Sequence, residues 1–304
     1  MSGQKETKKI IKILRYRPDI NKEPYYETFE VPQKDDTVVL NQLNYIKDTK
    51  DGSLSFRWSC QMGVCGSCGA MVNGKPVLTC ATFSKDYGNE ITVEPLDNFP
   101  IVKDLVVEMD GFMRKIESVK PWIIRDQEKD IEEGEYIQSP EQLDDYKQFS
   151  MCINCQLCYS ACPVVGEDEE FLGPAASALA YRYISDTRDQ GTIERMNGTL
   201  SHVGVWECSY VGECSTVCPK SVDPALAIQR MKALGATEIT KTLMIPNQKK
   251  TVNLPILGKM IKGWTNFLLS NRMIALLSLP ILFILALIEG GNIEEKMSKG
   301  REKK

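Results

Sequence analysis

The N-terminal third of the chain alternates short apolar runs with turn residues, a pattern typical of a small sheet. Residues 8–16 and 25–31 predict a pair of strands. Between residues 36 and 49 apolar side chains recur at helical spacing, so we predict a helix there. Its apolar face carries Val39, Leu43 and Ile46.

A hairpin and a further strand complete this first region. The sequence MVNGKPVLTC places Asn73 and Gly74 between two short apolar runs, and Asn-Gly is a strong signal for a hairpin turn. The run ITVEPL, at 91–96, predicts another strand. The loop that precedes the hairpin is rich in glycine, at Gly63, Gly66 and Gly69.

The pattern becomes helical in the second half of the chain. Residues 104–118 predict a helix. The stretch 126–145 holds nine acidic residues against one lysine, and we interpret it as a solvated connector. Two further helices are expected, at 173–189 and at 223–234.

The last part of the chain, residues 246–304, has a different character. Its positions 273–288 are 16 consecutive residues without a charge. As a helix they would extend roughly 24 Å, short of the ~30 Å hydrocarbon core of a bilayer. Trp264 and Phe267 just upstream suit a membrane interface. A buried helix packed on a partner subunit is the alternative. We predict membrane contact, with the protein peripheral or anchored by this tail at the cytoplasmic face of the cell membrane.

Charge and composition narrow the function classes. The 304 residues carry a net charge of −4 and have a pI near 5.4, which argues against a nucleic-acid partner because such a partner needs a basic face. The single histidine, His202, leaves little room for histidine-based catalysis or mixed zinc sites. Eleven cysteines are an odd number, their spacings are metal-like, and no signal peptide is recognisable. We therefore predict a reducing compartment, the cytoplasm, and not disulfides.

Every cysteine falls into an iron–sulfur ligand pattern. The first four read C-x4-C-x2-C-x11-C and are Cys60, Cys65, Cys68 and Cys80. This is the plant-type spacing of a [2Fe–2S] site. Zinc is the alternative, but zinc prefers two separated C-x2-C pairs, which match this run poorly. We expect Gly63 and Gly66 to adopt positive φ, because the loop must turn sharply and point backbone N–H groups at sulfur.

Two further cysteine runs form an internal repeat. The first reads C-x2-C-x2-C-x3-C followed by proline, the bacterial ferredoxin pattern in which the fourth cysteine ligates the other cluster. Applied to this chain, the exchange predicts a [4Fe–4S] cluster on Cys152, Cys155, Cys158 and Cys218. The other cluster would then be held by Cys162, Cys208 and Cys214.

The second run lacks its second cysteine, and Val211 stands in that position. Three thiolates suit a cluster that lacks one iron, so we predict a [3Fe–4S] cluster. The alternative is a labile [4Fe–4S] cluster with water or a non-cysteine fourth ligand. Val211 disfavours it, because valine cannot bind iron and is expected to exclude water.

Together these features predict an α+β protein with two domains and a tail. Residues 1–105 are expected to form a β-grasp plant-type ferredoxin domain that binds [2Fe–2S]. Residues 106–245 are expected to form an all-α, bacterial-ferredoxin-like domain that binds [4Fe–4S] and [3Fe–4S]. Residues 246–304 form the hydrophobic C-terminal tail.

The ordered motifs make the chain similar to a known family. It resembles the iron–sulfur subunit of the succinate dehydrogenase/fumarate reductase family over about residues 8–240. The resemblance rests on SCQMGVCGSCGAMVNGKPVLTC, CINCQLCYSACP, GPAASALAYRYISDTRD and CSYVGECSTVCPKSVDP. It implies a partner flavoprotein that oxidises succinate to fumarate at FAD, together with membrane anchor subunits. Electrons would pass from FAD through the three clusters to a quinone, and this chain would supply no catalytic acid or base.

Two departures from the family concern the quinone side. Relatives carry tryptophans after the proline that matches Pro163 and a histidine after the cysteine that matches Cys208. Here Val164 and Ser209 follow instead. The resemblance therefore implies a different quinone, anchor or acceptor. The quinone-side candidates are the residues that flank the third cluster, Pro163, Ser209 and Tyr210.

Other functions fit parts of the pattern. The same subunit would serve a fumarate reductase in the reverse direction, since direction depends on the cluster potentials and the quinone. A structural zinc protein and an iron–sulfur subunit of another flavin dehydrogenase are further alternatives. Of the remaining residues, His202 is expected to be structural, Trp206 to pack beside the third cluster, and 167–170 to form a solvated loop.

Overall fold

The structure, a computed structural model, describes residues 7–20 and 23–244, with side chains up to residue 237. The predicted hydrophobic tail lies outside the described residues. Within the part of the chain that is described, no helix is long and apolar enough to cross a membrane.

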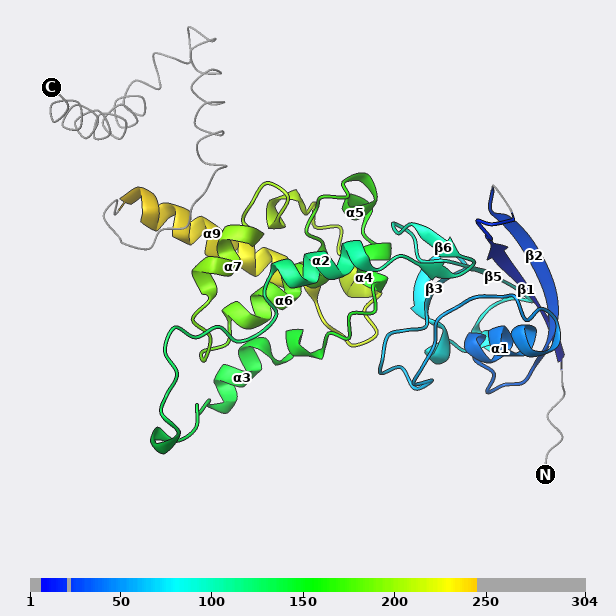
Figure 1. The fold of residues 1–304 in the computed structure, drawn as a ribbon, viewed down its shortest axis with the longest axis horizontal. Helices are drawn as coiled ribbons and strands as arrows, with labels where there is room; N and C mark the ends of the chain where they lie inside the picture. The colour runs from blue at the N-terminus through cyan, green and yellow to red at the C-terminus, as the bar shows by residue number, and fades with distance from the viewer. Residues whose placement is uncertain (1–6, 21–22, 245–304) are drawn as a thin grey trace, which may run out of the picture. The chain divides into compact units, whose positions relative to one another are not determined.

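A five-stranded sheet forms the N-terminal region (Figure 1). Its strands are β1 (Thr7–Arg15), β2 (Tyr25–Gln33), β3 (Gly69–Val72), β4 (Lys75–Leu78) and β5 (Glu90–Glu94). In space they lie in the order β2-β1-β5-β3-β4. β1 runs parallel to β5 at the centre, and the other neighbours are antiparallel. The predicted strand pair and hairpin are confirmed, with Asn73 and Gly74 both at positive φ in the turn.

Helix α1 (Val39–Thr49) packs against this sheet and completes its core. The predicted apolar face is confirmed, because Val39, Leu43 and Ile46 are each at most 1% exposed. They join apolar side chains from the central strands β1 and β5. Burial of that one face fixes which way the helix is turned on the sheet.

The helix predicted at 104–118 is wrong in its first half. A small hairpin of β6 (Ile101–Lys103) and β7 (Val106–Val107) comes first, and α2 (Asp110–Ser118) follows. Asp104 lies at the turn with a left-handed backbone (φ 46°), and its buried carboxylate accepts hydrogen bonds from Arg15. That long-range ion pair favours the turn over the helix that local periodicity predicts.

Arg15 is the centre of a buried charge network in the sheet region. Its side chain is 0% exposed, and its Nε lies 3.0 Å from Asp104 Oδ1. The Arg15 guanidinium also pairs with Glu27 at 2.5 Å and with Asp51 at 2.6 Å. The network joins strand β1, strand β2 and two loops far apart in the sequence.

The described residues after β7 form helices and loops. The helices are α3 (Pro140–Lys147), α4 (Leu157–Ser160), α5 (Pro163–Glu167), α6 (Pro174–Ile184), α7 (Thr192–Thr199), α8 (Glu213–Thr216) and α9 (Pro224–Met244). Short 3-10 helices lie at Thr79–Ala81, Ser84–Asp86, Ile131–Glu133, Phe149–Met151 and Val205–Glu207. α6 packs against α9, α7 and α2 (Figure 1). α4 packs against α8.

Three predicted boundaries in this region need correction. The helix predicted at 173–189 ends at Ile184. The acidic stretch 126–145 is not a connector throughout, because α3 begins at Pro140 inside it. Ser139 is the N-cap of that helix: its hydroxyl accepts the N–H of Gln142, and its own N–H donates to the Gln142 side chain. A count of charges does not detect this capping box. The last helix, predicted to end at residue 234, continues to Met244.

Sheet and helices share apolar contacts. Leu157 of α4 is 1% exposed and joins a cluster with Met71 of β3 and Leu78 of β4. The buried thiols of Cys68 and Cys80 belong to the same cluster. The first cysteine loop is therefore packed beside the start of the second.

Candidate functional site

The first four cysteines lie in and around the loop between α1 and β3. Gly63 and Gly66 have φ of 68° and 76°, which confirms the prediction of positive φ. The sulfur of Cys60 accepts hydrogen bonds from the backbone nitrogens of Val64 and Cys65, each at 3.3 Å. Gly63 donates its N–H to Cys80 Sγ at 3.3 Å. The loop therefore presents backbone donors to sulfur, as a cluster-binding loop requires.

The thiols of this first group differ in environment. A hydrogen bond with the Ser67 side chain, and then backbone N–H donors, lower the pKa of Cys65 to about 6. Burial raises the pKa of Cys80 to about 11. Met62 and Val64, on the tip of the loop, are 74% and 53% exposed. This group of thiols is therefore buried on the side of Cys80 and exposed at the tip of the loop.

Four cysteines from the two later runs line a single cavity. They are Cys152, Cys155, Cys158 and Cys218. Burial raises the pKa of Cys155 to about 11 and that of Cys158 well above its usual value. A buried thiolate is costly unless a cation compensates it, and iron is such a cation. The residues present therefore fit a four-iron cluster.

The other three cysteines, Cys162, Cys208 and Cys214, line a separate cavity together with Val211. Burial raises the pKa of Cys214 to about 11. Burial also raises the pKa of Cys162. Three thiols and no fourth cysteine among the residues that line this cavity fit a three-iron cluster.

Val211 departs from one expectation. It lines the third cavity, as predicted, but it is 57% exposed, so it does not by itself exclude water from the position of a fourth iron. The neighbouring Tyr210 is 60% exposed. The cysteine spacing correctly predicted that Val211 lies beside the third group of thiols. The expectation that it excludes water was wrong, because the burial of a side chain depends on what packs over it.

The two later runs share a backbone pattern that the sequence did not reveal. Two positions after the first cysteine of each run, Asn154 and Tyr210 are left-handed, with φ of 52° and 61°. Two positions further on, Gln156 and Gly212 are also left-handed, at 69° and 85°. A single helical turn follows in each case, α4 or α8. The internal repeat is thus a repeat of backbone conformation, and three of these four left-handed residues are not glycine.

The structure also bears on the zinc alternative. Among the residues that the structure describes, no three histidine, cysteine, aspartate or glutamate side chains lie close enough to hold a single metal ion. The preference for iron–sulfur clusters over zinc rests on the cysteine spacings, C-x4-C-x2-C and C-x2-C-x2-C-x3-C.

The quinone-side candidates Pro163, Ser209 and Tyr210 all line the third cavity and are exposed. His202 is exposed and lies outside this lining. Trp206 was expected to pack beside the third cluster, but it also lies outside the lining and packs near Gly235 of α9.

The first and second cysteine loops touch at Gly66. A Cβ on Gly66 would lie 2.9 Å from Cys155 Cβ and 3.1 Å from the carbonyl oxygen of Ile153. Contacts this short exclude a side chain, so only glycine lets the loops approach this closely. This contact sets how near the first and second groups of thiols lie.

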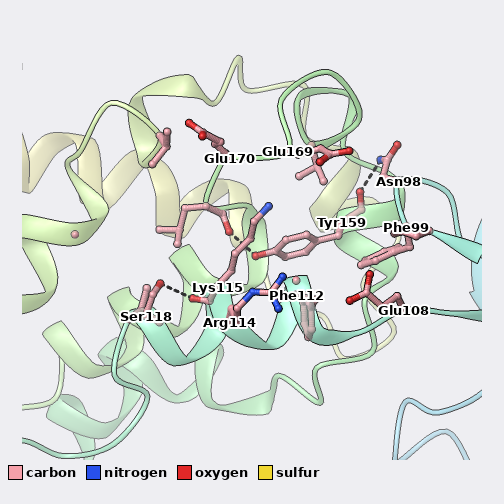
Figure 2. Close-up of a pocket in the computed structure, with 17 residues that line it drawn as sticks. Asn98, Phe99, Glu108, Phe112, Arg114, Lys115, Ser118, Tyr159, Glu169 and Glu170 are labelled. Carbon is pink, nitrogen blue, oxygen red and sulfur yellow. Dashed lines mark hydrogen bonds between the residues drawn. The ribbon is translucent and has the colours of Figure 1, made fainter.

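A different cavity, of about 580 Å³, contains no cysteine (Figure 2). Its lining includes Asn98, Phe112, Lys115, Tyr159 and Glu169. Burial lowers the pKa of Lys115, whose ammonium lies 5.7 Å from the centroid of the Tyr159 ring. The cavity is larger than those lined by the thiols, yet none of the predicted cluster ligands lines it.

The class of the protein follows from these groups of thiols and from two family matches. Residues 10–114 match the family described as "2Fe-2S iron-sulfur cluster binding domain". Residues 148–222 match the family described as "4Fe-4S dicluster domain". The chain is therefore an iron–sulfur protein with two cluster-binding regions.

Relatives define the family further. A fumarate reductase iron–sulfur subunit from Mycobacterium tuberculosis (strain CDC 1551 / Oshkosh) is 54% identical over 78% of this chain and 96% of the relative. The subunit named so in Haemophilus influenzae is 47% identical, and a succinate dehydrogenase iron–sulfur subunit from Coxiella burnetii is 37% identical over 72% of this chain and 94% of the relative. The chain belongs to the family of succinate dehydrogenase and fumarate reductase iron–sulfur subunits.

A solved structure agrees with the fold. A chain of the Mycobacterium smegmatis Sdh1 complex in the apo form matches with a TM-score of 0.70 and 26% identity. The match covers 77% of this chain and 97% of that chain. An N-terminal sheet region followed by a helical region is therefore common to both.

Proposed function

We propose that this chain carries single electrons between a FAD-containing succinate/fumarate subunit and a quinone, through three clusters. Bound iron–sulfur clusters supply one-electron redox chemistry. The chain's own residues provide thiolate ligands, backbone donors and burial. The sheet order β2-β1-β5-β3-β4 supports the predicted β-grasp arrangement of the first region.

The ligand assignment rests on how the fold sorts the cysteines. In this proposal Cys60, Cys65, Cys68 and Cys80 hold [2Fe–2S]. The second and third ligand sets, for [4Fe–4S] and [3Fe–4S], are Cys152, Cys155, Cys158 and Cys218, and then Cys162, Cys208 and Cys214. The observation that best supports this assignment is that the second and third sets line two separate cavities. Each set combines cysteines from both runs, as the bacterial ferredoxin exchange requires.

The substitution Val211→Cys tests the assignment. Val211 lies at the rim of the third cavity with Cys162, so a thiol there is in place to become a fourth ligand. We expect the oxidised three-iron EPR signal of the purified complex to disappear and a four-iron signal to appear on reduction. The wild-type complex, with iron and sulfide counts, is the reference. Survival of an unchanged three-iron signal in the variant would refute the ligand assignment.

The direction of electron flow has two candidates. Succinate oxidation is the first candidate. Fumarate reduction is favoured by the identities, 54% and 47% to subunits named fumarate reductase against 37% to one named succinate dehydrogenase. Potentials of the three clusters, with the rates of both reactions in the purified complex, decide between them. A low-potential [2Fe–2S] cluster with a low-potential quinone would indicate reduction.

The partners follow from the same proposal. A FAD subunit, membrane anchor subunits and a quinone would accompany this chain, as the relatives' succinate dehydrogenase and fumarate reductase names suggest. Pro163, Ser209 and Tyr210 are the proposed quinone-side residues because they are exposed beside the third cavity. Co-purification identifies the flavoprotein, and a partner that oxidises a different substrate would place the chain with another flavin dehydrogenase.

A further inference from the structure

A further cavity, of about 100 Å³, lies between the first and second cysteine loops. Cys65 of the first group of thiols and Cys155 of the second group both line it. The buried apolar residues Leu96, Leu105 and Val107 form another part of its wall. The cavity therefore occupies the gap between two groups of proposed cluster ligands.

Gln156 contributes a buried amide without a partner. It directly follows Cys155, lines this cavity and is only 6% exposed. Its Nε2 is buried and has no hydrogen-bond partner among the residues that the structure describes. Buried donors in native proteins are almost always paired, either with protein groups or with ordered water. A group that accepts a hydrogen bond from Gln156 is therefore expected in this cavity.

The lining of the cavity favours water as that group. A buried water needs about 10–15 Å³ of space and two to four polar partners. The cavity exceeds that volume, and Arg57, Ser67 and Asn154 line it together with Gln156. Among the described residues that line it, none is aspartate or glutamate, so a cation such as Mg²⁺ would lack carboxylate ligands. An anion would be repelled, because clusters with four thiolate ligands are negatively charged.

We propose that this cavity binds ordered water, which accepts a hydrogen bond from Gln156 Nε2 and lies between the first two clusters. Gln156 also lines the cavity of the second group of thiols, so this water lies close to the proposed [4Fe–4S] cluster. Water near a cluster stabilises its more negative, reduced state and raises its reduction potential. The effect on the potential rests on the proposed function, whereas the binding of water does not.

The substitution Gln156→Met tests the role of the amide. Methionine has a similar length and flexibility but no N–H donor in its side chain. In the purified complex, we expect a lower reduction potential for the [4Fe–4S] cluster than in the wild type. Pulsed EPR of the reduced complex in water enriched in ¹⁷O should also detect a weaker ¹⁷O coupling to this cluster. The label reports water alone, because amide oxygens do not exchange with solvent.

Gln61→Met is the matched control. Gln61 also directly follows a cysteine, and its left-handed backbone (φ 59°) resembles that of Gln156 (φ 69°). It is exposed, however, and lies outside the lining of this cavity. The control makes the same chemical change next to a cysteine but away from the proposed water. The potential of the [4Fe–4S] cluster and its ¹⁷O coupling should therefore keep their wild-type values.

A crystal structure of the wild-type complex, at a resolution that shows ordered water, is the direct test. We expect density for a water oxygen within hydrogen-bond distance of Gln156 Nε2, and the loss of that density in Gln156→Met. Absence of the density from the wild type would overturn the proposal, as would an unchanged [4Fe–4S] potential or ¹⁷O coupling in Gln156→Met.

Two further arms separate the remaining outcomes. Bromide at this position, identified by anomalous scattering after it replaces chloride in the buffer, would show an anion in place of water and overturn the proposal. If Gln156→Met does not assemble, the wild-type density and the bromide exchange decide. A wild-type complex without a [4Fe–4S] signal would instead refute the proposed function, while the density would still test the water.

Discussion

Gly66→Ala tests whether the first two cysteine loops are held in direct contact. The substitution acts in two ways at once. Gly66 has φ of 76°, a left-handed backbone that L-residues adopt at a cost. Its new Cβ would also lie 2.9 and 3.0 Å from the Cβ and Cα of Cys155, and 3.1 Å from the carbonyl oxygen of Ile153. Two of those three neighbours are backbone atoms, so the strain cannot be relieved by a side-chain rotation.

The two effects can be separated by a matched glycine. The left-handed backbone costs about 1–2 kcal/mol for alanine. Overpacking against fixed neighbours adds about 1–3 kcal/mol. Gly74 has φ of 75°, but a Cβ there meets nothing within 4 Å. Gly74→Ala therefore carries only the backbone cost, and the difference between the variants is the packing cost of the loop contact.

The assay is the thermal midpoint of the cluster-loaded protein, followed by far-UV circular dichroism. For a protein of this size, 1 kcal/mol shifts the midpoint by about 2–4 °C. We therefore expect Gly66→Ala to unfold about 2–12 °C below Gly74→Ala. Equal midpoints for the two variants would show that Gly66 does not press on Cys155, and the reasoning about loop approach would fail.

Three other predictions use the same protein. Asp104→Asn breaks a fully buried pair in which Arg15 Nε lies 3.0 Å from Asp104 Oδ1, and removing one partner of such a pair costs about 3–5 kcal/mol; an unchanged thermal midpoint would contradict this. Hydrogen bonds from Ser53 and then from Arg15 hold the pKa of Asp51 well below its usual value. Its stabilising contribution is therefore complete above the unfolded pKa of about 4 and is lost as the pH falls below that value, which midpoints measured on either side of about pH 4 will check. Deletion of residues 255–304 should move the complex from the membrane to the soluble fraction, and retention of the truncated complex would mean that partner subunits alone hold it there.

The backbone of the first cysteine loop was predictable because its sequence signals are local. A loop that wraps a cluster needs thiols at fixed intervals and glycines at sharp turns, and both are written in consecutive residues. Positive φ at Gly63 and Gly66 was predicted on that ground and is confirmed. The strands, the hairpin at Asn73 and Gly74, and the buried face of α1 follow from equally local patterns.

The remaining features depend on contacts between distant residues. Asp104 forms a turn where periodicity predicted a helix, because its partner Arg15 lies 89 positions away in the sequence. Asn98 is an ordinary loop asparagine in the sequence, and its partners lie some 60 residues later. Val211 was placed correctly beside the third group of thiols but is 57% exposed, since the burial of a loop residue depends on what covers it. A spacing predicts which atoms would bind iron, whereas the contacts that hold those atoms in position come from other parts of the chain. Such contacts should therefore be sought at residues without a motif, such as Asn98, whose amide donates to the carbonyl oxygen of Cys162.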